Sequence, residues 1–344
     1  MLASVVLSAL VQSGAAAQQI EVGIIDFYGL GQLSEAAVRQ ALTVKEGDTI
    51  AVASGVRPPV LEEMERRLTS VAGVARARTS LVCCEDGRAI LYVGIEGTAA
   101  KRQQFLPTPT GAVRLPAPIV ELGRTYEAAI LDAAQRGALR EDDSRGYALF
   151  DDPAARAIQE RFVGIAAAEQ AVLRRVLRES ADADQRALAA HILSYSPDKD
   201  AVVPDLVRAM RDPSEDVRND AMRGLAVFAN ASPGARPTRP IAYDGFVAML
   251  NSPVWTDRNK ASLALLRLSK DRDPRLLDRL RRDAMTPLVE MAGWKSVGHA
   301  SPALMLLARI ANLPDEVAAK AAASSEDRQA LLDAARKRDV DKRR

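Results

Sequence analysis

Side chains that could carry out acid–base or metal chemistry are scarce in this 344-residue sequence. The two histidines are His191 and His299, and the sequence contains none of the spaced patterns that mark a phosphate loop, a serine hydrolase or a zinc protease. His191 stands among apolar residues in a helical pattern, which favours a packed or surface histidine over a catalytic one. We therefore expect no catalytic residue, no cofactor and no metal site.

The only two cysteines, Cys83 and Cys84, are adjacent. Neighbouring residues of a strand point to opposite faces, so one interpretation is a buried thiol beside a thiol at the strand edge. The alternative is a disulfide between neighbours. A metal site is not expected, because no second Cys or His pair lies nearby.

One acidic segment, Glu141–Gly146 followed by Asp152, has the outline of a calcium-binding loop. Glycine falls at the sixth loop position, as such loops require, but Arg145 stands where an oxygen ligand should be. The last ligand is normally Glu, whereas this segment offers Asp152. We therefore predict a solvated loop between helices.

The composition favours stacked helices over a β-sandwich. Aromatic residues make up only 4% of the chain, so Ala and Leu supply most of its apolar mass. The formal net charge of +2 is too weak to indicate nucleic-acid binding. The last nine residues, from Arg336 onward, hold six basic and two acidic side chains, and a solvated end is the simpler interpretation of this tail.

Internal repeats are the most informative feature of the sequence. Similar segments open three predicted helices, at 183–193, 216–228 and 257–268. The apolar spacing predicts partner helices at 201–210 and 241–250, and a loop-like insertion at 231–240 lengthens the second repeat. The recurring polar positions are Arg186, Asp216, Arg218 and Arg258.

These units resemble HEAT repeats, which are armadillo-like helical hairpins. The resemblance is strongest in Val202–Leu206 and Arg211–Arg218. It implies that the recurring Asp and Arg form a ladder between neighbouring repeats. A single unit cannot bury its apolar stripe, so the units stack and present a concave surface. We assign residues 124–324 to this all-α solenoid and 325–344 to a C-terminal helix and basic tail.

Residues 18–97 predict a small α+β module of order β-α-α-β-β. Strands are expected at 20–27, 75–84 and 88–95, with helices at 34–42 and 59–71. The module resembles the POTRA domains of outer-membrane assembly and secretion proteins. The residues that carry the resemblance are Ile20-Glu21-Val22, Phe27-Tyr28-Gly29, Ser34-Glu35, Val38–Leu42, Lys45–Asp48 and Leu91–Glu96.

The two ends of this module predict a signal peptide and a linker. Residues 1–17 combine a short apolar run with small residues, so we expect cleavage after Ala17 and a periplasmic or secreted protein. Residues 98–123 contain four prolines and predict an extended linker. Each module should then fold alone.

The sequence thus predicts a multi-domain, non-catalytic scaffold of the cell envelope. It would bind protein partners through the concave face of the repeats, and an exposed strand edge of the α+β module would add a second contact. Two alternatives are a nucleic-acid-binding repeat protein, which would use Arg279, Arg281, Arg282 and the tail, and an enzyme related to the bilin lyases. The candidate partner-binding residues are Asp205, Arg208, Tyr243, Asp244 and Arg279.

Overall fold

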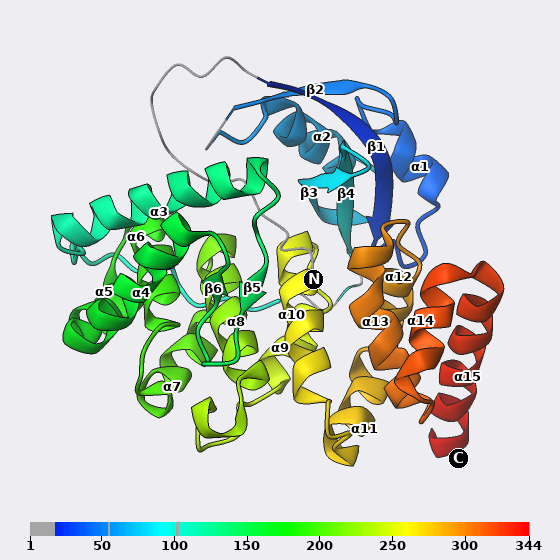
Figure 1. Cartoon of the computed structure of the whole chain (residues 1–344). Helices are drawn as coiled ribbons and strands as arrows, with labels where there is room; N and C mark the ends of the chain where they lie inside the picture. The colour runs from blue at the N-terminus through cyan, green and yellow to red at the C-terminus, as the bar shows by residue number, and fades with distance from the viewer. Residues whose placement is uncertain (1–17, 54–55, 99, 101–102, 344) are drawn as a thin grey trace. The chain divides into compact units, whose positions relative to one another are not determined.

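The computed structural model describes residues 18–53, 56–98, 100 and 103–343, with side chains through residue 337 (Figure 1). The predicted signal peptide lies outside the described residues. The chain forms two compact units. Among the described residues, the helical unit comprises 104–247 and 260–273, and the sheet unit comprises 18–103, 248–259 and the segment from 274 onward.

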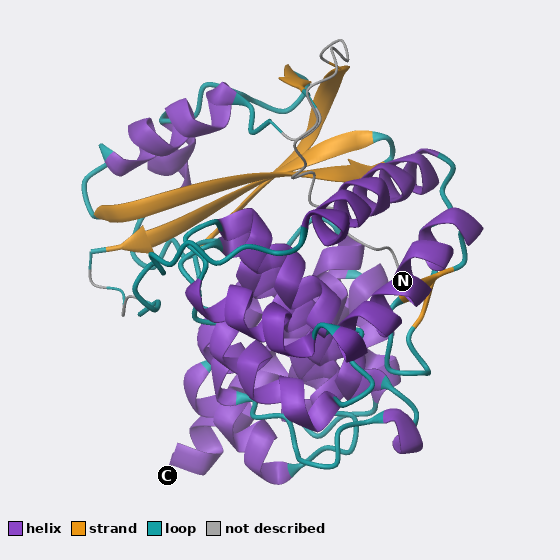
Figure 2. Cartoon of the chain, turned by 90° about the vertical axis from the view of Figure 1, so that its left-hand side faces the viewer, coloured by secondary structure: helices purple, strands orange, loops and turns teal. Residues whose placement is uncertain are grey.

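The sheet unit contains a four-stranded mixed sheet in the order β2-β1-β4-β3, drawn in orange in Figure 2. Strands β1 and β4 are parallel, and the other two pairings are antiparallel. The prediction of a small α+β module is confirmed, although the short strand β2 was missed. The elements are β1 (Gln18–Tyr28), α1 (Glu35–Gln40), β2 (Thr49–Val52), α2 (Pro59–Thr69), β3 (Val74–Glu85) and β4 (Arg88–Gly97).

One face of this sheet packs on α1 and α2. Helix α2 buries Leu61, Met64 and Leu68, which recur at helical spacing, and α1 buries Val38. The facing residues of β4 are Leu91, Val93 and Ile95, which alternate along the strand and belong to the same buried cluster. This apolar face explains why the pattern was readable from the sequence.

The opposite face of the sheet is covered by later segments of the chain. Tyr92 of β4 stacks on Trp255 at a centroid distance of 5.2 Å and contacts Trp294 at 4.9 Å. Gly94 permits the close approach, because a Cβ atom there would lie 1.9 Å from the carbonyl oxygen of Pro253. Strand β4 is therefore buried on both faces, from Ala89 to Glu96.

The remaining helices of the sheet unit follow the central helix α10 (Trp255–Leu268), whose first residues belong to this unit. Of these, only the C-terminal helix, which begins at Ser325, was predicted from the sequence. The helices are α11 (Pro274–Asp283), α12 (Met285–Ala292), α13 (Val297–Ile310), α14 (Asp315–Ala323) and α15 (Ser325–Arg343).

The helical unit is built from helical hairpins. Asp182 caps α6 by accepting from the backbone N–H groups of Asp184 and Gln185, and Asp152 caps α4 ahead of Pro153. The helices are α3 (Ala117–Gln135), α4 (Pro153–Ala168), α5 (Gln170–Glu179), α6 (Ala183–Leu193), α7 (Lys199–Ala209), α8 (Glu215–Asn230) and α9 (Asp244–Met249), with a 3-10 turn η1 (Pro233–Ala235) and a short hairpin of β5 (Glu141–Asp142) and β6 (Leu149–Phe150).

Three predicted boundaries need correction. The expected linker at 98–123 ends early, because helix α3 begins at Ala117 after a proline at its N-cap. The Asp152-Pro153 pair is a sequence signal for the start of a helix, and the apolar spacing predicts that this helix continues to about Leu177. It is instead broken at Glu169, whose backbone leaves helical geometry at ψ 18°. The predicted solenoid at 124–324 is also divided, since its C-terminal part belongs to the sheet unit.

Within the described part of the chain, no helix combines the length and the apolar character needed to span a membrane.

Candidate protein-binding surfaces

Three buried arginines mark the repeats. Each donates to the backbone carbonyl oxygen of the residue six positions earlier, and these residues are Ser180, Asp212 and Ser252 for Arg186, Arg218 and Arg258. The helix-opening turns are thus built alike. The recurring arginine therefore ties each turn to the helix that follows it.

The first arginine also reaches the next hairpin. Arg186 donates to both carboxylate oxygens of Asp212 at 2.9 Å, and both side chains are buried. In the sheet unit, Arg258 pairs with Glu290 at 2.8 Å. Bidentate geometry between buried groups fixes the spacing of successive hairpins. The acceptors are Asp212 and Glu290, whereas the ladder implied by the sequence used the recurring Asp position, that of Asp216.

An extended segment, residues 104–115, crosses the turns of the helical unit, and we call it the strap. Leu106 N–H donates to the carbonyl of Arg211 at 2.7 Å, beside the turn between α7 and α8. Further along, Gly111 exchanges hydrogen bonds with the turn between α5 and α6, donating to Glu179 at 2.9 Å and accepting from Ala181 at 2.8 Å. The strap thus binds two successive turns through main-chain groups.

Side chains add to this attachment. Phe105 lies under the guanidinium of Arg218 at 4.3 Å. Arg114 pairs with Asp182, and the N–H of Leu115 donates to the Gln185 side chain at 2.7 Å. The proline-rich composition predicted the extended conformation, but the structure holds this segment against the helices.

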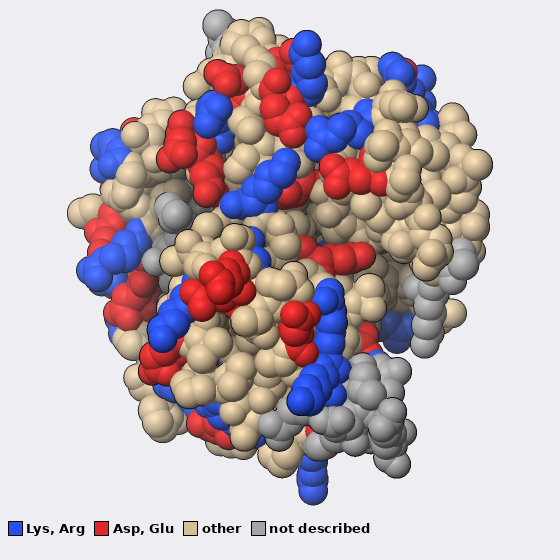
Figure 3. Space-filling view, turned by 90° about the vertical axis from the view of Figure 1, so that its right-hand side faces the viewer, with Lys and Arg blue, Asp and Glu red and all other residues tan. Residues whose placement is uncertain are grey.

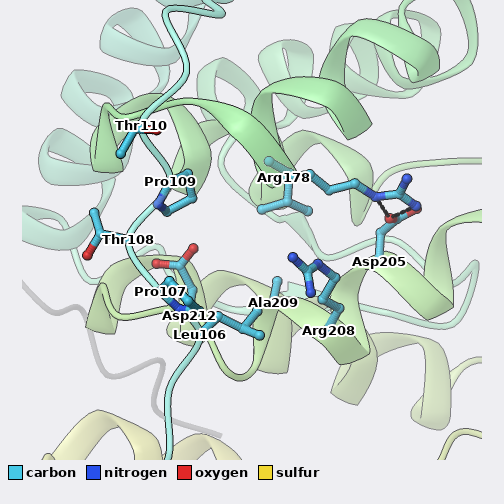
Figure 4. A pocket seen from close by; sticks show the side chains of 11 residues that line it. Leu106, Pro107, Thr108, Pro109, Thr110, Arg178, Asp205, Arg208, Ala209 and Asp212 are labelled. Atoms are coloured by element: carbon cyan, nitrogen blue, oxygen red, sulfur yellow. Dashed lines mark hydrogen bonds and ion pairs between the residues drawn. The ribbon is translucent and has the colours of Figure 1, made fainter.

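A pocket of about 260 Å³ opens between the strap and helices α5 and α7 (Figure 4). Asp205 lines it but is buried, and its carboxylate pairs with both Arg174 and Arg178. Arg208 is exposed, and within the described residues its guanidinium has no hydrogen bond or ion pair. Arg208 is therefore available to a partner, whereas Asp205 holds α5 and α7 together.

The acidic segment expected as a solvated loop is the β5–β6 hairpin, residues 138–150, and it is not fully solvated. Glu141 pairs with Arg223 of α8. Asp143 accepts from Asn230 at 2.9 Å with both oxygens and pairs with Arg267 of α10 at 3.1 Å. Both carboxylates are about three-quarters buried, so the prediction of a solvated loop is wrong for them.

Lys260 lies on the same side of α10 as Arg267, seven residues or about two turns toward the N-terminus. Burial lowers the pKa of Lys260 to about 8, and the charges of Arg223 and Arg267 act in the same direction. In the described part of the chain its ammonium group makes no hydrogen bond or ion pair. The charge of Asp220 acts in the opposite direction, so this carboxylate offsets part of the effect on Lys260.

A polar network holds residues 148–150, the end of the hairpin loop and its second strand. The side-chain amide of Gln159 donates to the carbonyl of Ala148 at 2.6 Å, and its oxygen accepts from the N–H of Phe150 at 2.7 Å. Tyr195 also donates to Ala148, at 2.9 Å. Burial raises the pKa of Tyr195 well above its usual value, so the hydroxyl acts as a neutral donor.

The two histidines are packed among aromatic rings. His191 lies 5.1 Å from Tyr126 and 5.4 Å from Tyr195, measured between ring centroids. His299, in the sheet unit, shares a hydrogen bond of 2.7 Å between its Nδ1 atom and the hydroxyl of Tyr92. The position of His191 agrees with the expectation of a packed or surface histidine.

The outer edge of strand β3 is partly occupied by side chains. The N–H of Thr79 donates to the Glu65 carboxylate at 2.7 Å, and its carbonyl accepts from Arg57 at 2.8 Å. Without these contacts, the N–H and the carbonyl of Thr79 could form hydrogen bonds with an added strand. The middle of this edge is therefore closed to the strand addition that the sequence suggested.

Cys83 and Cys84 form a disulfide between neighbours. Both residues are exposed, so the interpretation with one buried thiol is wrong.

The other candidate binding residues do not form one site. Tyr243 is partly buried and Asp244 is exposed, and both belong to the helical unit. Arg279 belongs to the sheet unit and pairs with Asp283 at 2.9 Å. Of the predicted repeat positions, Asp216 lies partly buried in the first turn of α8. The hairpin contacts Arg223, Asn230, Lys260 and Arg267 were missed, because no local motif marks them.

The basic residues proposed for nucleic-acid binding are not a free stripe. Arg281 is buried, pairs with Asp278 and donates to the carbonyl of Ile310 at 3.1 Å. Arg282 is exposed. On the face drawn in Figure 3, basic and acidic side chains are interspersed, which does not resemble a nucleic-acid footprint.

In the described ranges, no three His, Cys, Asp or Glu side chains come together in a group that could hold a metal ion. The residues that outlined a calcium loop serve other contacts. Asp152 caps α4 and pairs with Arg136 at 2.9 Å.

No protein-family model and no curated protein matches the chain. Solved structures that match include a designed armadillo repeat protein in complex with the peptide (KR)4, at 16% identity and a TM-score of 0.36, covering 55% of this chain and 94% of that one. Another is a computationally designed armadillo repeat protein for modular peptide recognition, at 18% identity and a TM-score of 0.35, with the same coverage. These values are too low to bear on function, so the repeat assignment rests on the arginine-marked turns.

Proposed function

We propose that this protein is a non-catalytic scaffold whose helical unit binds extended segments of partner proteins. The observation that carries the proposal is the strap. Helical hairpins that hold residues 104–115 by main-chain hydrogen bonds at successive turns present groups suited to an extended polypeptide. The exposed guanidinium of Arg208 lies beside this segment and offers a partner a charged anchor.

The absence of catalysis is part of the proposal. His191 and His299 pack among aromatic rings. Asp205, a buried carboxylate that lines the pocket, pairs with Arg174 and Arg178. A catalytic acid or base must reach a substrate proton, which these positions do not favour. The bilin-lyase-like alternative has no set of residues to support it.

The test uses the full chain and a partner captured from an extract of its native cells. Binding of the purified partner should weaken about tenfold or more in Arg208→Ala, as expected for loss of an anchor residue. Arg175→Ala is the matched control, because Arg175 is two-thirds exposed and pairs only with its helical neighbour Glu179. If both variants bound the partner with the affinity of the wild type, the pocket would not be part of the binding surface.

We further propose that the repeats are of the HEAT type and the sheet module of the POTRA type. The arginine-marked turns support the first assignment. Two helices on one face of a mixed sheet support the second, although strand β2 is an addition to the β-α-α-β-β order. Strand addition at β3 is not part of the proposal, because Glu65 and Arg57 occupy the edge at Thr79.

A cell-envelope location is also proposed, on the strength of residues 1–17 alone. N-terminal sequencing of the mature protein should then begin at Gln18. Recovery of the intact chain from the cytoplasm would contradict export and would favour the nucleic-acid alternative.

A further inference from the structure

The strap is not attached to the helices along the whole of its length. Leu106 is bound at the turn between α7 and α8, and Gly111 at the turn between α5 and α6. The four residues between them are Pro107-Thr108-Pro109-Thr110. Because proline has no backbone N–H and holds the residue before it in extended geometry, this span cannot form a continuous ladder with the turns. The pocket of about 260 Å³ lies between the span and helices α5 and α7.

The span keeps main-chain donors that the helical unit does not use. The backbone N–H groups of Thr108 and Thr110 form no hydrogen bond with another described residue, and both residues are exposed. An extended chain lying along the span could accept from these groups, as a strand does at a free edge. The strap therefore offers a partner main-chain contacts directly beside the pocket.

Both carboxylates in the pocket wall are already paired. Asp205 accepts from Arg174 and also pairs with Arg178, and its side chain is only 1% exposed. Both carboxylate oxygens of Asp212 accept from Arg186 at 2.9 Å. Neither carboxylate is left to neutralise a further cation.

Arginines outnumber the carboxylates at this pocket. Arg208 lines it, is exposed, and has no hydrogen bond or ion pair among the described residues. Arg178 also lines it and keeps 46% of its side chain exposed despite its pair with Asp205. In Figure 4 both side chains lie at the end of the pocket where Asp205 is drawn. A negatively charged group would therefore be attracted to this end.

The size and lining of the pocket indicate which negatively charged group fits. Its volume of about 260 Å³ is smaller than the range of about 300–1,000 Å³ that is usual for small-molecule sites, so it suits a single side chain. Pro107, Pro109 and Leu177 supply apolar walls for the methylene groups of that side chain. A carboxylate matches the fork of a guanidinium. A phosphate dianion fits less well, because Asp205 and Asp212 place charge of the same sign in the wall.

We propose that this pocket binds the carboxylate of an acidic side chain in an extended partner segment that lies along the Pro107–Thr110 span. The inference rests on the proposed function, since it names the side chain that the Arg208 anchor receives. Arg208 forms the direct ion pair with the carboxylate. Arg178, which Asp205 holds in place, supplies the second positive charge.

The experiment uses the full chain and a short peptide, capped at both ends, in which a central glutamate is flanked by serines. Its control carries glutamine at the central position, so the two probes differ only in the carboxylate. Titration followed by NMR should give a dissociation constant about tenfold or more lower for the glutamate peptide. The amide signals of Thr108 and Thr110 and the Nε–H signals of Arg178 and Arg208 should shift, whereas the Nε–H signal of Arg175 should not.

Two variants separate charge at the pocket from charge in general. Arg208→Ala should weaken binding of the glutamate peptide about tenfold or more, to the level of the glutamine peptide. Arg208 is exposed, so this variant should fold like the wild type, which circular dichroism checks. Arg175→Ala removes an exposed arginine that pairs with Glu179 on the same helix, and it should bind both peptides as the wild type does.

Three results would overturn the proposal. One is equal affinity of the wild type for the glutamate and glutamine peptides, and another is unchanged binding of the glutamate peptide to Arg208→Ala. The third concerns the choice of anion. Inorganic phosphate should displace the glutamate peptide no better than chloride does at the same ionic strength, and stronger displacement would assign the pocket to phosphate instead.

These outcomes are distinct from failure of the proposed function. If Arg208→Ala weakens binding of a captured partner but the glutamate peptide binds no better than the glutamine peptide, only the carboxylate inference fails. If the glutamate peptide binds at the pocket but no protein partner binds the chain, the scaffold proposal fails while the site remains.

Discussion

At the residue scale, stability of the helical unit depends on buried charges that satisfy one another. Arg186 is almost fully buried, yet it donates to a backbone carbonyl and to both oxygens of Asp212. Removing one member of such a pair leaves the other charge buried without compensation. The arginine positions could be recognised from sequence, because residues of one type recur at one place in each repeat.

Arg186→Ala should destabilise the helical unit by about 3–5 kcal/mol, the range for a broken buried pair. The measurement is urea unfolding followed by circular dichroism. Arg175→Ala breaks a pair in which both side chains are more than half exposed. This control should lower the free energy of unfolding by less than about 1 kcal/mol. Similar losses for the two variants would show that the Arg186–Asp212 pair stabilises the protein no more than an exposed pair does.

Asp216 should make stability depend on pH. Burial raises its pKa from 3.8 to about 6, and the nearby carboxylates of Glu215, Asp220 and Asp184 add to the effect. The folded state therefore holds a proton that the unfolded chain releases. The stabilisation from this proton is complete below pH 3.8 and is lost as the pH rises through about 6.

Asp216→Asn should consequently melt at a higher temperature than the wild type at pH 7.5, with the difference closing as the pH falls from about 6 toward 4. Thermal unfolding at several pH values measures this gap. Asp333→Asn removes an exposed carboxylate and controls for net charge. The buried placement of Asp216 would be contradicted if the two proteins melted at the same temperature at pH 7.5, or if their melting temperatures moved further apart in acid.

At the element scale, the strap and the hairpin show where sequence reasoning stopped. The helix at 183–193 was predicted with the bounds that α6 has, because its cap and apolar spacing are local signals. Proline content predicted that residues 104–115 are extended but could not indicate the turns that bind them. The pair of Glu141 and Arg223, which are 82 positions apart, depends on tertiary packing and has no local signal.

Gly111→Ala tests how the strap is held. A Cβ atom at this position would lie 2.5 Å from the carbonyl oxygen of Glu179, so the strap must shift and lose hydrogen bonds to the turn. Amide exchange of Gly111 and Ala181 should accelerate, with a loss of about 1–3 kcal/mol in unfolding free energy. Thr108→Ala, at an exposed strap position, is the control. Unaltered protection at residues 111 and 181 would show that the strap tolerates the side chain.

At the scale of the whole molecule, the first and last parts of the chain form one folded unit. The sequence suggested that residues 18–97 fold alone, since one face of the sheet has a clear apolar pattern. Its other face packs on Trp255 and Trp294, which follow far later in the chain. No pattern within residues 18–97 could reveal this cover, because Tyr92 and Gly94 are compatible with an exposed strand face.

An isolated 18–97 fragment should therefore lack cooperative thermal unfolding and should bind an apolar dye, because Tyr28 and Tyr92 lose their buried contacts. Near-ultraviolet circular dichroism and dye fluorescence measure both effects. A sharp unfolding transition without dye binding would show that the sheet module is independent after all.

The central claim is that the helical unit is the surface that binds partner proteins. The most direct measurement is photo-crosslinking of the full-length protein in its native cells, with a photoreactive residue replacing Arg208 or Lys260 of the helical unit. Val56 and Arg66, exposed positions of the sheet unit, are the comparison. We predict crosslinks to the same protein partner from the two helical-unit positions and none from the other two. Crosslinks only from Val56 and Arg66 would contradict the claim.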